Sequence, residues 1–384
     1  MTALDLLALP DVGEEFSFSD EHELTRASAR RFLAERCPTS EVRRLMDDPV
    51  GHDASTWRSM AELGWLGTTV PQPLGGAALD PLHLALLFEE QGRALLPSPF
   101  LACQLALSAL ELAATPEQAA RWIPPILSGE QIATLAFEEP SGASRGAADT
   151  RAVPARGGWV LVGVRPHVLG AASAGLVIVP ATEPDGGVGL FAVELPHPCV
   201  LVEAERSVDT TRRAARLVLE GASVPAAARL ERSSRAVVER VEARGRTLLA
   251  AEMAGGIAAV LERTRAYACE REQFGRPIGA FQAVKHPIVD TMVSAELARS
   301  LALGAAVAWS REPARHDTLS RMAKAYASDA FAVAVRRGVQ LHGGYGFTWD
   351  CDIQLWFKRA VASRALLGDA LHHRRWLAAA LGGA

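Results

Sequence analysis

Residues suited to holding a phosphate group and a flat ring occur together in one short stretch, residues 271–282. The guanidinium of Arg271 offers five donors in a fixed fork, and Phe274 offers an aromatic face three positions later. Gln282 closes the stretch with an amide. The same residues also suit an ordinary helix hairpin with a solvated arginine and a core phenylalanine. Taken alone, the stretch leaves both interpretations open.

A second stretch of the same kind follows a long helical pattern and contains Gln340, Gly343 and Gly344. Two glycines at a helix end often serve only as a C-cap. They also let backbone N–H groups approach a pyrophosphate without a Cβ in the way, and Gln340 adds an amide. A lone pair of glycines is a weak signal, but its combination with the first stretch is informative.

Long helices must position both stretches. Apolar helical patterns cover residues 250–267 and 281–309, and Gly275, Pro277 and Gly279 interrupt them. Residues 271–280 are therefore predicted to form a turn between two long helices.

The wider pattern changes twice along the chain. The first ~130 residues read as helical, because apolar residues recur at helical spacing and β-branched runs are nearly absent. Short β-type runs separated by turn residues then favour a small antiparallel barrel or sandwich, before helical patterns return. We predict a mostly α fold with a central β domain, divided into residues 1–131 (helical), 132–225 (β) and 226–384 (helical).

Composition excludes several classes of function. The net charge of −4 and pI near 6.2 give no basic excess for nucleic-acid binding. No apolar run reaches the ~20 residues of a membrane span, and no secretion signal opens the chain. Five dispersed cysteines without metal-ligand spacing argue against a disulfide scaffold and a metal site. We expect a cytoplasmic protein.

Several motifs in a fixed order resemble one known family. They are Gly64-Trp65-Leu66-Gly67, Val70-Pro71 with Gly75-Gly76, Arg271-x-x-Phe274-Gly275, Phe281-Gln282 and Gln340-Leu341-His342-Gly343-Gly344. With these motifs the chain resembles the acyl-CoA dehydrogenases over almost its whole length, and a member of an actinobacterial or a heteromeric type in particular. The resemblance is strongest from residue 250 to residue 374.

The resemblance implies a flavoprotein with an N-terminal helical domain, a middle β-barrel and a C-terminal four-helix bundle. It implies that Arg271 binds the FAD diphosphate, that Phe274 packs on the adenine side and that Gln282 adds a hydrogen bond. Further groove residues would come from the facing protomer, namely Gln340, Gly343 and Gly344.

The implied reaction belongs to fatty acid or lipid metabolism. A carboxylate removes the α-proton of an acyl-CoA thioester while hydride passes from the β-carbon to FAD, giving the 2-enoyl-CoA. The implied partners are the acyl-CoA substrate and an electron-transfer flavoprotein or similar acceptor. The implied assembly is a homodimer, a homotetramer or a heterotetramer with a paralogous subunit.

Two β-domain segments depart from the family pattern. Residues 137–145 carry Glu138 where the family uses a hydroxyl on the flavin, which puts the flavin contacts of this segment in question. The segment that covers the flavin reads as residues 165–170. His167 of this segment lies either by the flavin ring or at a core or edge position without contact to it.

The expected base is absent from both positions that the family uses, because these positions hold Gly245 and Leu367. Glu252 is the nearest replacement. It follows Gly245 by seven residues, so on an ideal helix it returns to nearly the same face, ~10 Å further along. Asp369 is a second candidate.

Two hypotheses about function follow. In the first, the chain is a self-sufficient dehydrogenase with Glu252 as its catalytic base. In the second, it is a non-catalytic structural subunit that completes the FAD site of a partner carrying the base, and Glu252 pairs with an arginine such as Arg246 or Arg321 for packing alone.

Overall fold

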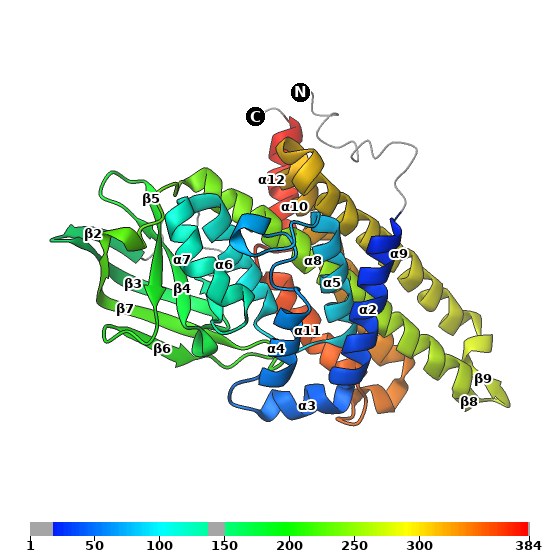
Figure 1. The fold of residues 1–384 in the computed structure, drawn as a ribbon. Helices are drawn as coiled ribbons and strands as arrows, with labels where there is room; N and C mark the ends of the chain where they lie inside the picture. Colours follow the sequence, from blue (N-terminus) through cyan, green and yellow to red (C-terminus); the bar gives the residue numbers. More distant parts are fainter. Residues whose placement is uncertain (1–17, 137–149, 383–384) are drawn as a thin grey trace. The chain divides into compact units, whose positions relative to one another are not determined.

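A computed structural model describes residues 18–136 and 150–382 of the chain. Packing divides the chain into two compact units. The first unit comprises residues 1–43, 81–96 and 246–384, and the second comprises residues 44–80 and 97–245. The predicted order of helices, strands and helices is confirmed, with the strands of the large sheet lying between Ala133 and Pro225 (Figure 1). The three-domain division by composition stays a prediction.

Two helices of the first unit meet backbone to backbone. These are α5 (Pro81–Ala94) and α8 (Arg235–Glu270), which begins in the second unit and continues in the first. A Cβ added at Gly92 would lie 1.8 Å from the backbone oxygen of Glu252, and one at Gly255 would lie 1.8 Å from that of Glu89. No side chain fits at either glycine, so this crossing fixes the position of α8.

The other helices of the first unit pack around these two (Figure 1). They are α2 (Asp20–Arg36), α9 (Gln282–Arg311), α10 (Pro313–Leu341), α11 (Ile353–Ala365) and α12 (Ala370–Gly382). Helix α10 touches α9, α11 and α12, and α2 lies on α5. By length and composition α9 could cross a membrane, but half of its most apolar window is buried inside the protein, as in a core helix.

The second unit contains the β-sheet, whose strands run in the order β1-β4-β2-β3-β7-β6, with β5 paired to β4. The strands are β1 (Ala133–Leu135), β2 (Thr150–Ala155), β3 (Gly158–Leu169), β4 (Leu176–Thr182), β5 (Val188–Glu194), β6 (Val200–Ala204) and β7 (Ala214–Pro225). Strand β4 pairs in parallel with β1 and β2, whereas the other pairings are antiparallel. The predicted β domain is therefore confirmed, but it is an open, curled half-barrel, and its parallel pairs correct the prediction of a purely antiparallel barrel.

Helices complete the second unit. They are α4 (Ala54–Glu62), α6 (Phe100–Ala113) and α7 (Pro116–Leu127), and α3 (Thr39–Asp47) precedes them. Helix α6 packs on β1, and its Cys103 thiol accepts a bond from the Ala133 N–H at 3.4 Å. Nearly every residue of α6 is buried, as expected for a helix that is apolar on all sides.

Candidate functional site

The predicted turn after α8 is a tight β-hairpin. Strands β8 (Glu272–Gln273) and β9 (Arg276–Pro277) pair across Phe274 and Gly275, which have φ angles of 55° and 78°. Such a turn favours Asn-Gly, because both central residues must be left-handed. A bulky aromatic in this conformation costs about 1–3 kcal/mol. Phe274 makes an edge contact with Phe281 but is still 91% exposed, so its side chain is suited to contact something outside the chain.

Arg271 lies at the base of this hairpin with its donors available. Its backbone is held on both sides, because its N–H donates to the Tyr267 oxygen and its oxygen accepts from the Ile278 N–H, both at 2.8 Å. Its side chain is exposed, and no described residue bonds to its guanidinium. Gln282 is exposed as the first residue of α9, and that helix begins without a side-chain cap. The first N–H groups of α9, which no side chain caps, and the guanidinium of Arg271 therefore lie close together in the sequence at one end of the first unit.

The glycine turn reaches the same end of α8. The His342 ring, at the end of α10, stacks on Tyr267 with centroids 4.4 Å apart, and the Tyr267 hydroxyl donates to the His342 oxygen at 3.4 Å. Tyr267 lies one helical turn before Arg271. The two predicted stretches are thus neighbours within one chain. The family resemblance implies, however, that the glycine turn contacts the FAD held by the facing protomer. Which protomer each stretch serves stays a prediction.

The surface of the glycine turn is open. A Cβ added at Gly343 or Gly344 would meet nothing within 4 Å. Gly343 needs its freedom because its φ is 63°, but the φ of Gly344 lies outside the left-handed region. Among the described residues no contact requires a glycine at 344, and the predicted close approach of the FAD diphosphate would give a reason for one. Gln340 is exposed beside the turn.

Glu252, the first base candidate, is enclosed in an ion pair. Its Oε1 lies 2.5 Å from Nη1 of Arg359 on α11, and each side chain is 2% exposed. The two arginines that the sequence suggested as partners, Arg246 and Arg321, pair with Asp317 instead. Glu252 therefore pairs with a buried arginine, as one of the two alternatives holds, but this arginine is Arg359, which the sequence did not indicate.

Asp369, the second candidate, caps a helix. Its carboxylate accepts the His372 N–H at 2.7 Å at the start of α12. The turn before it holds Leu367 and Gly368 at φ angles of 55° and 92°. Lys324 of α10, fully buried, donates to the Gly368 oxygen at 2.9 Å and secures this turn.

In the β-sheet, His167 lies in a bulge of β3 with a φ of 55°, and its Nδ1 is 3.1 Å from the Glu205 carboxylate. Whether it also lies by the flavin ring stays a prediction. The departure at Glu138 falls in residues 137–149, outside the described part of the chain.

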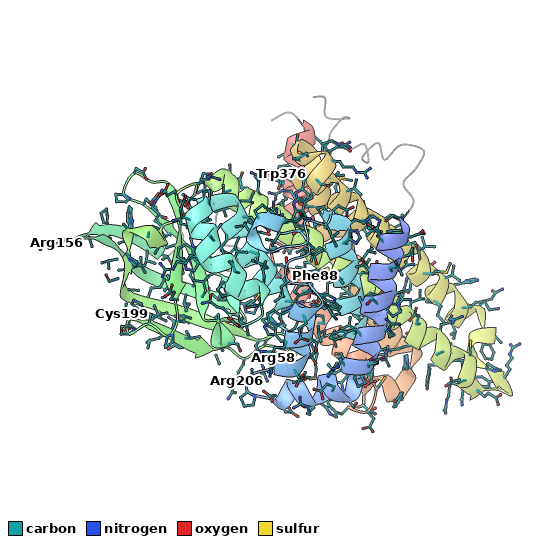
Figure 2. The ribbon with its side chains drawn as sticks, viewed as in Figure 1. Arg58, Phe88, Arg156, Cys199, Arg206 and Trp376 are labelled. Carbon is teal, nitrogen blue, oxygen red and sulfur yellow. The ribbon has the colours of Figure 1, made fainter. Side chains whose placement is uncertain are left out.

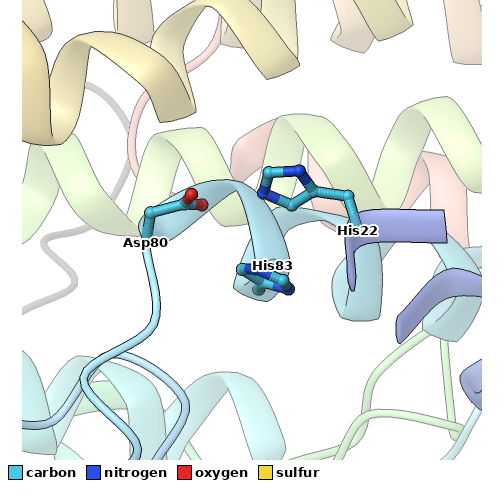
Figure 3. A group of neighbouring side chains, drawn as sticks. All are labelled: His22, Asp80 and His83. Carbon is cyan, nitrogen blue, oxygen red and sulfur yellow. The ribbon is translucent and has the colours of Figure 1, made fainter. Parts of the chain in front are cut away.

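A pair of histidines elsewhere in the first unit has a structural explanation. His22 and His83 lie with ring centroids 4.2 Å apart (Figure 3). His22 Nδ1 bonds the Ser19 hydroxyl at 2.8 Å in the cap of α2, and His83 Nδ1 bonds the Thr25 hydroxyl at 3.0 Å. Figure 3 also labels Asp80, which belongs to the second unit. We assign the histidine pair to the contact between α2 and α5.

Comparison with known proteins decides the family. The sequence models of the N-terminal and the C-terminal domain of acyl-CoA dehydrogenases match residues 19–130 and 235–382. The chain belongs to the acyl-CoA dehydrogenase family. The resemblance seen in the sequence is thereby confirmed, and members of this family of oxidoreductases bind FAD.

Three acyl-CoA dehydrogenase relatives cover nearly all of the chain. Acyl-CoA dehydrogenase IpdE2 of Mycolicibacterium smegmatis is 30% identical over 94% of this chain and 99% of its own length. A solved variant of the Tcur3481-Tcur3483 steroid ACAD is 30% identical with a TM-score of 0.87, covering 95% of this chain and 98% of its own. The ChsE4-ChsE5 complex from Mycobacterium tuberculosis is 26% identical with a TM-score of 0.89, covering 96% and 99%.

The residues at the end of α8 fit the diphosphate and adenine part of FAD. Arg271 supplies free donors, Phe274 an uncovered ring and Gly344 an approach without a Cβ. Sequence reasoning missed Tyr267 and Arg359. Tyr267 lies four residues before Arg271 and so on the same helix face, which is a signal that helical spacing offers. Arg359 lies 107 residues from Glu252 and offers no such signal.

Proposed function

We propose that this chain is a structural subunit of a heteromeric acyl-CoA dehydrogenase. It holds the diphosphate and adenine part of FAD, and a second, homologous subunit supplies the catalytic base. The observation that carries this proposal is the Glu252–Arg359 ion pair, because it engages the carboxylate of the best base candidate on α8 in a buried salt bridge.

None of the four positions considered for the base offers an available carboxylate, which supports the proposal. Gly245 and Leu367 have no carboxylate. Glu252 would have to break a buried charge pair before accepting a proton, and separating Arg359 from this carboxylate costs about 3–5 kcal/mol. The Asp369 carboxylate already accepts the His372 N–H at the start of α12.

The cofactor role rests on residues that are all exposed in the single chain. Arg271 would hold the diphosphate through charge-assisted bonds, Phe274 would cover the adenine side and Gln282 would add a hydrogen bond. Three more residues would line the groove, namely Gln340, Gly343 and Gly344. FAD, when bound, accepts the hydride that leaves the β-carbon of the acyl-CoA. This chain would orient the cofactor for that step.

The partner is inferred from the relatives and from the exposed surface. Two similar solved proteins are named as pairs, Tcur3481-Tcur3483 and the ChsE4-ChsE5 complex. Apolar residues of α9 that recur at helical spacing are about half exposed, as at a subunit contact. They are Val289, Met292, Val293 and Leu297. We propose a heterotetramer that works in the cytoplasm on an acyl-CoA and passes electrons to an electron-transfer flavoprotein or a similar acceptor.

The alternative is a self-sufficient enzyme, a homodimer or homotetramer with Glu252 as base. It is favoured by the place of Glu252 on α8, seven residues after the family position at 245. That enzyme requires Arg359 to release Glu252 when substrate binds.

Reconstitution separates these hypotheses. The chain is purified alone and after co-expression with a homologous subunit that has the base, and flavin bleaching by a panel of acyl-CoAs is followed without oxygen. We expect bleaching only in the co-expressed assembly, and loss of FAD from it in Arg271→Ala but not in the control Arg265→Ala, an exposed arginine of α8. An FAD-loaded homo-oligomer that is bleached by an acyl-CoA would reject the structural role.

A further inference from the structure

His373 of α12 is buried without any hydrogen bond. Its side chain is 0% exposed, and neither ring nitrogen has a partner among the described residues. Arg321 of α10 is 2% exposed, and its Nη1 is likewise unpaired. Buried polar groups are nearly always bonded, and each exception needs an explanation.

These unpaired groups belong to one contact between two helices. The guanidinium carbon of Arg321 lies 4.3 Å from the ring centroid of Trp376, which is labelled in Figure 2. Trp376 follows His373 by three residues, so both occupy the same face of α12. The Arg321 fork and the His373 ring therefore both lie at the α10–α12 contact.

The surrounding groups are mainly positive. Arg246 of α8 and Arg321 share the Asp317 carboxylate, at 2.6 Å and 2.9 Å. The Lys324 ammonium donates to two backbone oxygens in the turn before α12. That turn presses on the histidine, because a Cβ at Gly368 would lie 2.9 Å from His373 Nε2.

We propose that the α10–α12 contact is a binding site for a carboxylate ligand, with Arg321 Nη1 and the ring N–H of His373 as its donors. A carboxylate is planar and has two acceptor oxygens, so one group satisfies donors that otherwise cost about 1–3 kcal/mol each when buried unpaired. The site shares no residue with the proposed FAD groove, so it does not depend on the proposed function.

The electrostatic field favours an anion at this contact. Burial, and then the charges of Arg246, Lys324, Arg321 and His372, lower the pKa of His373 to about 2. The ring is therefore neutral at physiological pH and donates through one nitrogen. The same positive potential that opposes a proton on His373 attracts a carboxylate.

Access requires a small movement of α12. Helix α12 packs on α10 chiefly through Ala370, His373 and the Trp376 ring. It is the last described helix of the chain, and helices near a chain end open at lower free-energy cost than central ones. The ligand would enter as α12 lifts and would hold the helix down once bound.

Thermal unfolding of the full chain with carboxylates tests the site. Acetate and succinate are titrated against sodium chloride at equal ionic strength, with inorganic phosphate as a separate series. We expect a saturable rise in Tm of about 2 °C with a carboxylate, and slower hydrogen exchange of α12. A rise no larger than that with chloride overturns the proposal, and a larger rise with phosphate overturns the choice of carboxylate.

Variants add a second readout. His373→Leu removes one donor and is expected to abolish the saturable rise in Tm. The control His372→Ala changes the exposed neighbour and is expected to keep it. Arg321→Lys keeps a cation near Asp317 but removes Nη1, and we expect at least tenfold weaker carboxylate binding by calorimetry. Unchanged binding in both His373→Leu and Arg321→Lys overturns the site, and if His373→Leu does not fold, Arg321→Lys alone decides.

Discussion

The Glu252 carboxylate lies 2.5 Å from the Arg359 guanidinium, and both side chains are buried between α8 and α11. Removing one partner of such a pair leaves a buried charge, and the cost of that charge exceeds the value of the pair itself. A measurement of stability after substitution of Glu252 can therefore distinguish a structural glutamate from a catalytic one.

Glu252→Gln is expected to lower the free energy of unfolding by about 3–5 kcal/mol, because Arg359 stays charged and buried. Urea denaturation measures it. The control Glu262→Gln, on the same helix, removes a carboxylate that is 59% exposed beside Arg93, and we expect a loss below about 1 kcal/mol. Unchanged stability in Glu252→Gln together with lost turnover would identify Glu252 as the base.

The two glycines of the turn after α10 are expected to respond differently to alanine. At Gly344 the new methyl group meets nothing within 4 Å, so stability stays constant while FAD affinity in the assembled enzyme falls. At Gly346 the methyl group would lie 2.4 Å from the Val339 oxygen, so the chain is destabilised. Tm and bound flavin absorbance report the two effects. A drop in Tm for Gly344→Ala would contradict the ligand role.

His373 is expected to make stability depend on pH. Its folded pKa is about 2, whereas the ordinary value is 6.5, so the unfolded chain binds a proton that the folded chain does not. Stability is then complete above pH 6.5 and falls by up to about 1.4 kcal/mol per pH unit as the pH drops below it. Urea midpoints between pH 7 and pH 5 in wild type and His373→Leu measure this. Equal slopes in the two proteins would contradict the burial of a neutral ring.

Phe274→Asn is expected to stabilise the isolated chain by about 1 kcal/mol, because asparagine tolerates the left-handed first position of the hairpin turn better. The same change is expected to weaken FAD binding in the assembly by removing an aromatic face. Tm of the chain and flavin content of the assembly are measured in parallel. A loss of Tm would show that Phe274 has a packing role within the chain.

Local sequence patterns predicted the helices and strands well, because apolar spacing and turn residues act over short distances. The turn that contains Phe274 and Gly275 and the glycine turn at 343–344 followed from residue types alone, whereas the β8–β9 pairing across the first turn did not. The parallel pairing of β4 with β1 and β2 did not, since register between distant strands depends on the whole sheet.

Long-range partners account for the remaining differences. A pairing of Glu252 with an arginine was one of the two alternatives, but its partner Arg359 comes from α11, far along the chain. The contact of Tyr267 with His342 places the glycine turn beside the end of α8 within one protomer, which the sequence did not indicate. Neither contact has a periodic signal, because each joins different helices. Which protomer each stretch serves stays a prediction.

The backbone crossing of α5 and α8 limits how this chain can be re-engineered. The Glu252 oxygen is pressed against Gly92, so the path of the chain at residue 252 is set by two helices. Sliding that residue toward a substrate would force the helices apart. Grafting a carboxylate at 245 or 367 leaves the crossing intact, and under the proposed structural role it is the shorter route to an autonomous catalyst.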